Sequence, residues 1–131
     1  MPSFVLPADE LEYAVLVKLW DLGAASVREL HEKIGGPEGR VYTTTAKVID
    51  RLRDKGLLQR QRRGRAFVYT ARVARPQVEN ARAKQALSRL LGATPYAAVA
   101  ALVDAVDAFD PKLLDELERA VKARRRSKRG A

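Results

Sequence analysis

The sequence predicts a mainly α-helical protein, in which three helices and a β-hairpin are followed by a second helical region. Apolar residues recur at helical spacing on both sides of a short β-rich stretch at residues 57–70. Glycines and prolines interrupt these periodic stretches, as they commonly do at helix ends. The 131 residues, 47% of them apolar, suffice for one ordinary domain or for a small domain with an oligomerisation segment.

Residues that commonly start or stop helices mark the bounds of the first two predicted helices. Residues 8–22 carry apolar side chains on both helical faces, and Gly23 ends that stretch. Ser26, with Glu29 three positions later, forms a capping-box pattern that starts a second helix. This second helix is short, about two turns, because the glycines and proline of residues 35–37 stop it.

A third helix is expected to begin between Tyr42 and Thr44, where a threonine can cap it, and to reach Lys55 with Gly56 as its stop. Its predicted buried face consists of Thr45, Val48, Ile49 and Leu52. A turn of about 100° per residue places the opposite face in solvent. That face holds Thr43, Lys47, Asp50, Arg51 and Asp54, with Thr44 at its margin.

The stretch at residues 57–70 predicts a two-stranded hairpin, because residues 67–69 favour strands and follow an arginine-rich turn at Arg63 and Gly64. Three further helices are expected in residues 76–91, 94–106 and 110–123. Their apolar residues are too many for three short helices to cover alone. Homodimerisation is the natural outlet, and packing against the first domain is the alternative.

Basic charge is concentrated in two segments of the chain. In all, 25 Lys and Arg stand against 16 Asp and Glu, for a formal net charge of +9. Residues 40–72 contain ten Lys and Arg but only Asp50 and Asp54 as acids, and residues 122–131 contain six bases and no acid. Such charge predicts an anionic polymer or surface as partner.

The composition leaves few routes to catalysis or metal binding. The chain has no cysteine, and its one histidine, His31, is interpreted as a surface or capping residue. Acid pairs such as Asp104 with Asp107 fit helical salt bridges better than general acid–base pairs. We therefore predict no enzyme activity, cofactor or metal site. The sequence also shows no apolar run long enough for a membrane span and no signal peptide, so a soluble cytoplasmic protein is expected.

Three helices followed by a hairpin are the layout of a winged helix-turn-helix. The third helix fits a major groove, with Thr43 and Thr44 placed for phosphates. Lys47 can reach base edges, and Arg51 can bind a phosphate or a guanine. The wing arginines are expected to meet the sugar-phosphate backbone or a minor groove. These arginines are Arg60, Arg62, Arg63 and Arg65.

Residues 6–72 resemble the penicillinase-repressor (BlaI/MecI/CopY-like) family of winged-helix transcriptional repressors. The resemblance is carried by the segments LEYAVLVKLW, SVRELHEKI, VYTTTAKVIDRLRDKGLLQR and GRAFVYTA. In that family a helix reading tyrosine, threonine, threonine leads into an arginine-leucine pair and a lysine-glycine turn. The matching residues are Tyr42, Thr43, Thr44, Arg51, Leu52, Lys55 and Gly56, and Gly64, Arg65 and Tyr69 of the hairpin also fit.

Two residues depart from the family pattern. Thr45 stands where the family usually has an aliphatic residue, and Lys47 stands where a second threonine is common. The resemblance also implies a C-terminal helical dimerisation region. The sequence has neither the cysteine motif of metal-responsive members nor an asparagine-phenylalanine pair like the one cut in the resistance repressors, so no inducer or upstream sensor is assigned.

Together these observations predict a sequence-specific repressor that binds a double-stranded DNA operator with an inverted repeat as a homodimer. The expected domains are a winged helix-turn-helix at residues 1–72, a helical dimerisation region at 73–123 and a disordered basic tail at 124–131. That tail is either a nonspecific phosphate clamp or a solubilising segment. The predicted DNA-binding residues are Tyr42, Thr43, Thr44, Lys47, Arg51, Arg62, Arg63 and Arg65.

A rival function is a winged-helix protein-interaction or adaptor module, whose basic face would meet an acidic protein without specific DNA binding. RNA binding ranks last, because the sequence lacks the aromatic pairs that commonly stack on single-stranded bases.

Overall fold

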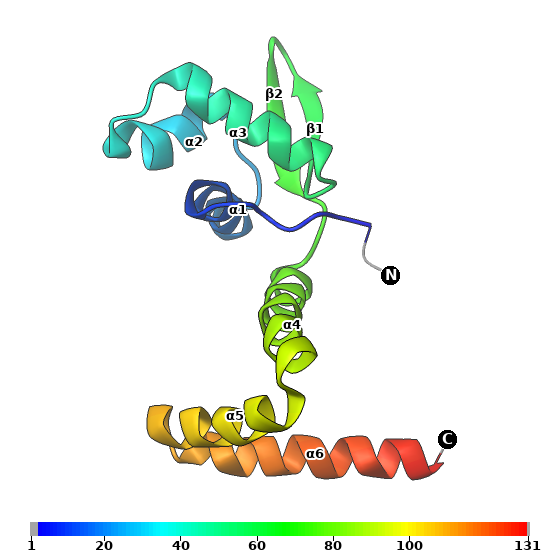
Figure 1. Cartoon of the computed structure of the whole chain (residues 1–131). Coiled ribbons are helices and arrows are strands. Elements are labelled where there is room, and N and C mark those ends of the chain that lie inside the picture. Colours follow the sequence, from blue (N-terminus) through cyan, green and yellow to red (C-terminus); the bar gives the residue numbers. More distant parts are fainter. Residues whose placement is uncertain (1–2, 131) are drawn as a thin grey trace. The chain divides into compact units, whose positions relative to one another are not determined.

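The computed structural model describes residues 3–130 and divides into two compact units between Ala83 and Lys84 (Figure 1). The boundary lies inside a long helix, α4 (Arg75–Ala93), and not between residues 72 and 73 as predicted from the sequence. The helix crosses that boundary because no proline or glycine interrupts its periodic stretch after its first turn until Gly92.

The first unit is a winged helix-turn-helix, as predicted. Its helices pack on one another and on a two-stranded antiparallel sheet. Its elements are α1 (Glu10–Leu22), α2 (Val27–Leu30), the π-helical turn η1 (His31–Gly35), the 3-10 turn η2 (Gly36–Glu38), α3 (Tyr42–Asp54), β1 (Leu58–Arg63), β2 (Ala66–Ala71) and the start of α4.

Helix α2 begins with the predicted capping box. The Ser26 amide donates to Glu29 Oε1 at 3.0 Å, and the Glu29 amide donates to Ser26 Oγ at 3.2 Å. The hydrogen bond from the Ser26 amide, followed by the one with its side chain, lowers the pKa of the Glu29 carboxyl. The capping box fixes where the first helix of the helix-turn-helix starts.

Helix α3 buries the four residues that its periodicity predicts: Thr45, Val48, Ile49 and Leu52. The predicted threonine cap is wrong. Val41 occupies the N-cap with an extended backbone, and no side chain among residues 3–130 caps the helix. Thr43 and Thr44 instead lie within the first turn, because helical backbone begins at Tyr42.

The end of α3 depends on Gly56, as predicted. Gly56 has a φ of 79°, a left-handed conformation that glycine adopts without strain. A Cβ at this position would also lie 2.7 Å from the backbone oxygen of Ser3. The extended N-terminal segment therefore packs closely against this turn, and the Val5 amide donates to the Lys55 carbonyl at 2.8 Å.

The hairpin closes through a two-residue turn at Gly64 and Arg65, between the paired residues Arg63 and Ala66. Gly64 has a φ of 63°, which suits the first central position of a type II′ turn. At the base of the hairpin, the Tyr69 amide donates to the Ala25 carbonyl at 2.8 Å. This bridge ties the wing to the loop before α2.

The core of the first unit joins α1, α2, α3, the hairpin and the start of α4. Trp20 lies at its edge, where the indole Nε1 donates to the Val73 carbonyl at 2.9 Å. The buried apolar residues are Val15, Leu16, Leu19, Ala25, Leu30, Val48, Ile49, Leu52, Leu57, Leu58, Tyr69 and Val78.

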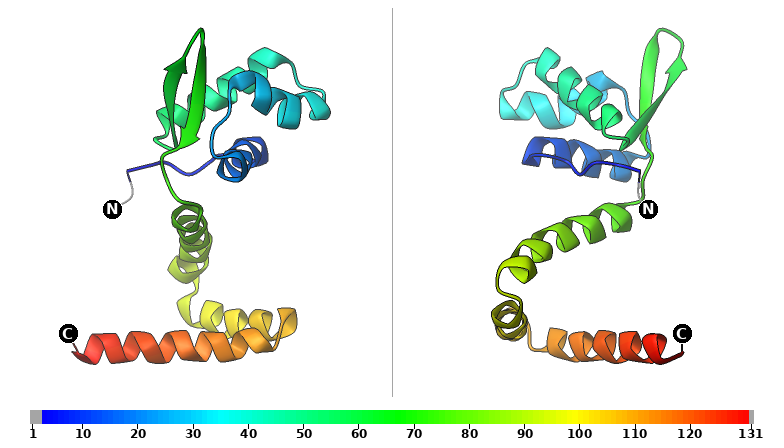
Figure 2. Two further views of the ribbon diagram at one scale, coloured as in Figure 1. Left: turned by 180° about the vertical axis from the view of Figure 1, so that it is seen from behind. Right: turned by 45° about the vertical axis from the view of Figure 1, so that its right-hand side comes forward.

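The second unit contains the end of α4, α5 (Pro95–Phe109) and α6 (Lys112–Gly130). Helices α5 and α6 run antiparallel, and α6 extends past the start of α5 (Figure 2). Neither of these helices has a fully buried residue. None of the described helices is both long and apolar enough to cross a membrane.

Residues 124–130 are helical, which corrects the expectation of a disordered tail. They continue α6 without interruption, and Ala131 lies outside the described residues. Arginine, lysine and alanine are all good helix formers, and no proline or glycine occurs in α6 before Gly130. The prediction of disorder relied on the charge of this segment and did not take its high helix propensity into account.

Candidate nucleic-acid interface

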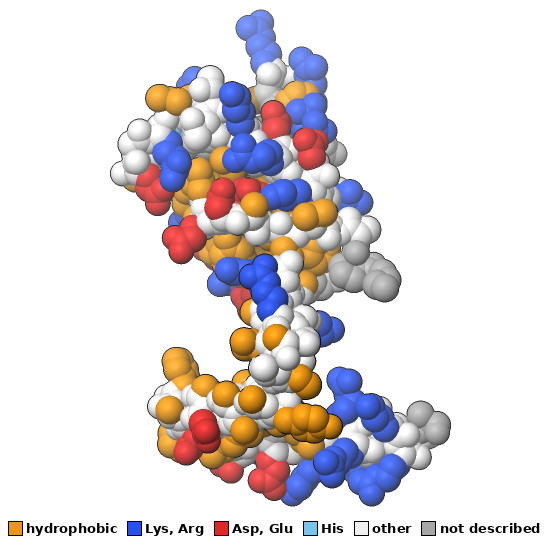
Figure 3. Space-filling model, in the orientation of Figure 1, with side chains coloured by type: hydrophobic (Ala, Val, Ile, Leu, Met, Phe, Trp, Pro, Cys, Tyr) orange, Lys and Arg blue, Asp and Glu red, His pale blue; other side chains and the backbone are white. Residues whose placement is uncertain are grey.

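The face of α3 turned away from the core is polar and exposed. Thr43, Lys47 and Arg51 are exposed on it, and Thr44 is half-buried at its margin. The two acidic residues of this face, Asp50 and Asp54, are exposed among the bases. Figure 3 shows Lys and Arg side chains gathering over α3 and the hairpin, with a few acidic side chains between them.

The start of α3 offers unpaired backbone donors. The Thr44 and Thr45 amides both donate to the Val41 carbonyl, at 3.1 and 3.4 Å. Among residues 3–130 the Tyr42 and Thr43 amides have no such partner. Because the first amides of a helix attract anions, this uncapped end suits a phosphate.

The wing arginines lie on different faces of the hairpin. Arg62 pairs with Phe67, so both side chains share one face, whereas Arg63 pairs with Ala66 on the other. Arg65 stands in the turn itself. The hairpin contacts α3 through β1 and projects beyond that helix (Figure 1). The two faces can therefore meet two different walls of a groove.

One face of the wing holds its arginines over an aromatic ring. The Arg60 guanidinium lies 3.9 Å from the centre of the Phe67 ring, and that of Arg62 lies 5.8 Å away. The Arg62 Nε also donates to the Gly64 carbonyl at 3.3 Å. These contacts restrict the two side chains before any ligand arrives. Arg60 thus shares this face with Arg62, although it is not among the predicted DNA-binding residues.

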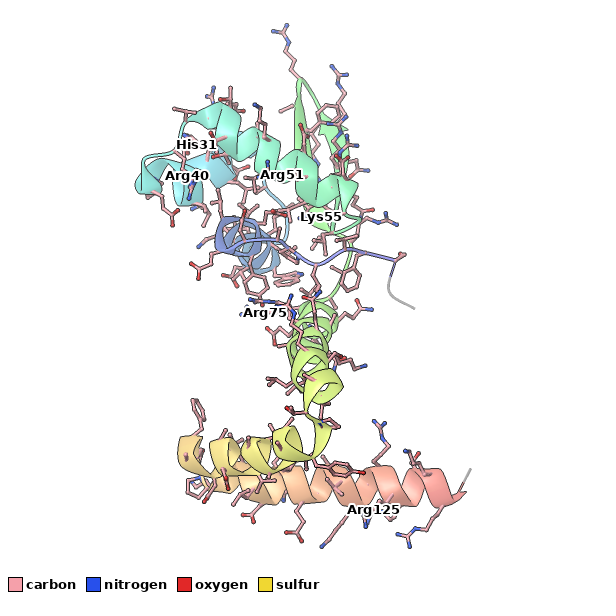
Figure 4. All side chains as sticks on the ribbon, viewed as in Figure 1. His31, Arg40, Arg51, Lys55, Arg75 and Arg125 are labelled. Atoms are coloured by element: carbon pink, nitrogen blue, oxygen red, sulfur yellow. The ribbon has the colours of Figure 1, made fainter. Side chains whose placement is uncertain are left out.

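A buried carboxylate anchors the C-terminal half of α3. Glu12 of α1 is 1% exposed, and its Oε1 accepts a hydrogen bond from Lys55 Nζ at 2.5 Å. The Glu12 Oε2 lies 3.9 Å from Arg51 Nε, while the Arg51 side chain stays 51% exposed. Figure 4 shows Arg51 and Lys55 on successive turns of α3 above α1. Glu12 therefore fixes Lys55 and orients Arg51 at the edge of the exposed face.

A second contact fixes the N-terminal half of α3. His31 Nδ1 and Thr45 Oγ1 share a hydrogen bond of 2.7 Å, and either atom can donate, depending on the histidine tautomer. The His31 ring also meets the Tyr42 ring edge-on, with centroids 5.5 Å apart. His31 is thus a half-buried link between the two helices of the helix-turn-helix and not a surface residue.

Gly35 makes this link possible. A Cβ at Gly35 would collide with Thr45 Oγ1 and lie 2.8 Å from His31 Nδ1. The close approach of the two helices also explains Thr45 itself. An aliphatic side chain at this position could not hydrogen-bond the imidazole.

We expect Thr45→Val to lower the free energy of unfolding of the first unit by about 1–2 kcal/mol, because His31 Nδ1 loses its partner in a half-buried position. Urea unfolding, followed by the fluorescence of Trp20, measures this cost. In a His31→Leu background the same substitution should cost far less. An equal cost in both backgrounds would show that the hydrogen bond contributes nothing.

The roles of Glu12, Lys55 and His31 in positioning α3 are not predicted from the sequence. Glu12 carried a readable signal, because an acid occupies the helical face of α1 that also bears Leu16 and Leu19. Its partners on α3 could not be read from spacing, since Lys55 is distant in the chain. Among residues 3–130, no group of three or more His, Cys, Asp or Glu side chains is arranged to hold a metal ion.

Comparison with protein families gives one match, to the family described as penicillinase repressor, over residues 9–123. The matched segment contains all predicted site residues and ends before the last basic residues of α6. A comparison with curated proteins gave no match.

Several solved structures are similar to the chain. The DNA-binding domain of the repressor BlaI is 23% identical with a TM-score of 0.49, and the match covers 55% of this chain and 89% of that domain. BpsR from Bordetella bronchiseptica is 24% identical with a TM-score of 0.48, and the match covers 79% of this chain and 76% of BpsR. PcaV from Streptomyces coelicolor is 24% identical with a TM-score of 0.48, and the match covers 81% of this chain and 79% of PcaV.

Proposed function

The chain belongs to the penicillinase repressor family of DNA-binding regulators, and on this premise we propose that it acts as a homodimer on an inverted-repeat operator. The observation that carries the proposal is the exposed polar face of α3, with Lys47 and Arg51 on it, beside an arginine-bearing wing. Such a helix fits the major groove, and two copies related by a two-fold axis read two half-sites.

The residues of α3 receive different roles in this proposal. The uncapped amides of Tyr42 and Thr43, together with the Thr43 and Thr44 hydroxyls, bind a phosphate at the start of the helix. Lys47 lies one turn further along the exposed face, where a side chain reaches base edges. Arg51 follows on the next turn and, held near Glu12, meets a phosphate or a guanine.

The wing supplies contacts that do not depend on sequence. Arg62 and Arg63 project from opposite faces of the hairpin, and Arg65 lies at its turn. A hairpin with cations on both faces suits a minor groove, whose two walls are phosphate backbones. The hairpin also closes through a short turn of only two residues, Gly64 and Arg65.

The second unit supports the homodimer. Leu87, Leu90, Leu91 and Leu102 line an apolar hollow between the end of α4 and α5. Phe109 is 85% exposed and Tyr96 is 92% exposed, although both are large apolar side chains. A lone copy thus leaves its apolar helices in water, and a second copy would cover them.

The adaptor function remains the alternative, and a binding titration separates the two. Sequence-specific DNA binding predicts an affinity for duplex DNA that falls steeply with salt and a preferred site that outcompetes random duplex. An adaptor with an acidic protein partner shows no preference among duplexes. A flat response to DNA sequence would therefore favour the adaptor.

Lys47→Ala is expected to relax operator preference without abolishing binding. A lysine that pairs with guanine acceptors contributes about 1–3 kcal/mol of discrimination, which is roughly 5- to 150-fold. Titration of the variant against the operator and against random duplex measures both affinities. Equal weakening on both duplexes would show that Lys47 contacts only phosphate. Lys47→Arg is the matched control, because it keeps the charge and can also pair with guanine.

A further inference from the structure

We propose that the C-terminal end of α6 is a second DNA-binding surface, which grips the phosphate backbone of a duplex without reading its sequence. The surface, here named the basic helix end, comprises residues 122–130. This proposal rests on the proposed function only because it takes DNA as the anionic polymer that the surface binds. It lies in the second unit, apart from α3 and the wing in the chain.

Every residue of the basic helix end is exposed, and its positive charge is almost uncompensated. Its six cations are Lys122, Arg124, Arg125, Arg126, Lys128 and Arg129. Lys122 is paired with Glu118 at 2.8 Å, and their hydrogen bond lowers the pKa of Glu118. Within residues 3–130 the other five cations have no carboxylate partner. Figure 4 shows Arg125 on the part of α6 that extends beyond its overlap with α5.

Three of these cations form one face of the helix. Arg125, Lys128 and Arg129 stand at positions i, i+3 and i+4, and they line a shallow hollow on the surface. Cations four residues apart on a helix repel one another, as Arg125 with Arg129 and Arg124 with Lys128 do. The helix dipole offsets this repulsion only in the last turn. A bound anion would remove the rest of the repulsion.

The dimensions of the basic helix end fit a duplex. Lys122 and Arg129 are seven residues apart, so at 1.5 Å per residue the cations span about 10 Å of helix. Duplex DNA carries about one negative charge per 1.7 Å, or about six over that length. Four of the six cations are arginines, and guanidinium groups bind phosphate oxygens in a bidentate manner.

Two other polyanions fit less well. Between Lys122 and Gly130 the remaining residues are Ala123 and Ser127, so no large apolar side chain can insert into a lipid surface. No aromatic side chain is present to stack on the bases of a single strand. The match to the repressor family ends at residue 123, so family membership does not account for this surface.

The test compares the salt dependence of binding to a short duplex that lacks the operator, using the full-length chain. A triple variant, Arg125→Gln, Lys128→Gln and Arg129→Gln, keeps helix propensity but removes three charges. Each lost phosphate contact flattens the plot of log affinity against log salt by about 0.9, so the slope should fall by up to about 2.7. Substitution of both arginines by lysine should retain most of the slope.

A matched triple variant removes the same charge elsewhere in the second unit. Lys84→Gln, Arg89→Gln and Lys112→Gln change exposed cations outside the basic helix end, and they should leave the slope unchanged. Far-UV circular dichroism and sedimentation confirm that both variants keep their helices and their oligomeric state.

The proposal is overturned if the first variant keeps the wild-type slope or if both triple variants lose it equally. Tighter binding of the wild type to vesicles rich in phosphatidylserine, or to polyglutamate, than to duplex at equal salt would also overturn it. Loss of operator preference alone does not alter these readings, because the probe contains no operator. Failure of the operator proposal and failure of this one are therefore distinguishable.

Discussion

Replacing Arg62 and Arg63 together with alanine is expected to lower the salt slope of DNA binding by up to about 2, with operator preference nearly intact. The two side chains lie on opposite faces of the hairpin, so each meets its own phosphate backbone when the wing enters a groove. Each single variant should lose about 0.9 of slope. Titrations of operator and random duplex over a range of salt concentrations measure the effect.

The matched control keeps the charge of the wing. Arg62→Lys with Arg63→Lys should retain most of the slope, although lysine lacks the planar group that Phe67 supports. If the hairpin instead lies flat on one phosphate backbone, only one of the two single alanine variants should lose salt slope. An unchanged slope in the folded double alanine variant would exclude the wing from DNA contact.

Lys55→Met is expected to lower the free energy of unfolding of the first unit by about 3 kcal/mol, because it leaves the buried Glu12 carboxylate without its closest cation. Arg51 is 3.9 Å away and half exposed, so it compensates only weakly. The fluorescence of Trp20, the only tryptophan, reports urea unfolding of this unit.

A double variant serves as the control for this prediction. Glu12→Leu with Lys55→Met removes both charges and fills the site with apolar groups, so it should recover most of the lost stability. Arg51→Met should cost less than about 1 kcal/mol, as expected for an exposed ion-pair partner. A loss below that level for Lys55→Met, or no recovery in the double variant, would mean that Glu12 is not anchored by Lys55.

The exposed face of α3 could be predicted because it depends on helical periodicity alone. Four apolar or small positions recur at intervals of three and four, and they are the residues that the helix buries. The hairpin was predictable for a similar local reason, since β-rich residues follow an arginine-glycine turn. Gly64 adopts a positive φ in this turn, a backbone conformation that favours glycine.

The contacts that hold α3 in place could not be predicted from local pattern. Glu12 meets Lys55 across 43 positions of the chain, and His31 meets Thr45 across 14. Neither spacing follows from a helix or strand repeat, because each contact depends on how separate helices pack. The sequence predicts only a helix stop at Gly35, whereas its missing side chain lets Thr45 reach the imidazole.

The helical structure of the basic helix end could not be predicted from apolar periodicity. A segment without apolar periodicity was expected to be disordered, yet it continues α6 to Gly130. Apolar periodicity reveals a helix only where one face of that helix is buried. The basic helix end buries no face, so its sequence carries no apolar periodicity. Residue propensity and the absence of a breaker were the better guide.

Selection of bound duplexes from a random pool tests the central claim most directly. A homodimer that reads DNA through α3 should enrich an inverted repeat, with half-site centres separated by about one helical turn or a multiple of it. The same selection with Lys47→Ala should relax the preference at one position of each half-site. Enrichment of a single half-site would contradict the two-fold assembly, and no enrichment at all would contradict sequence-specific repression.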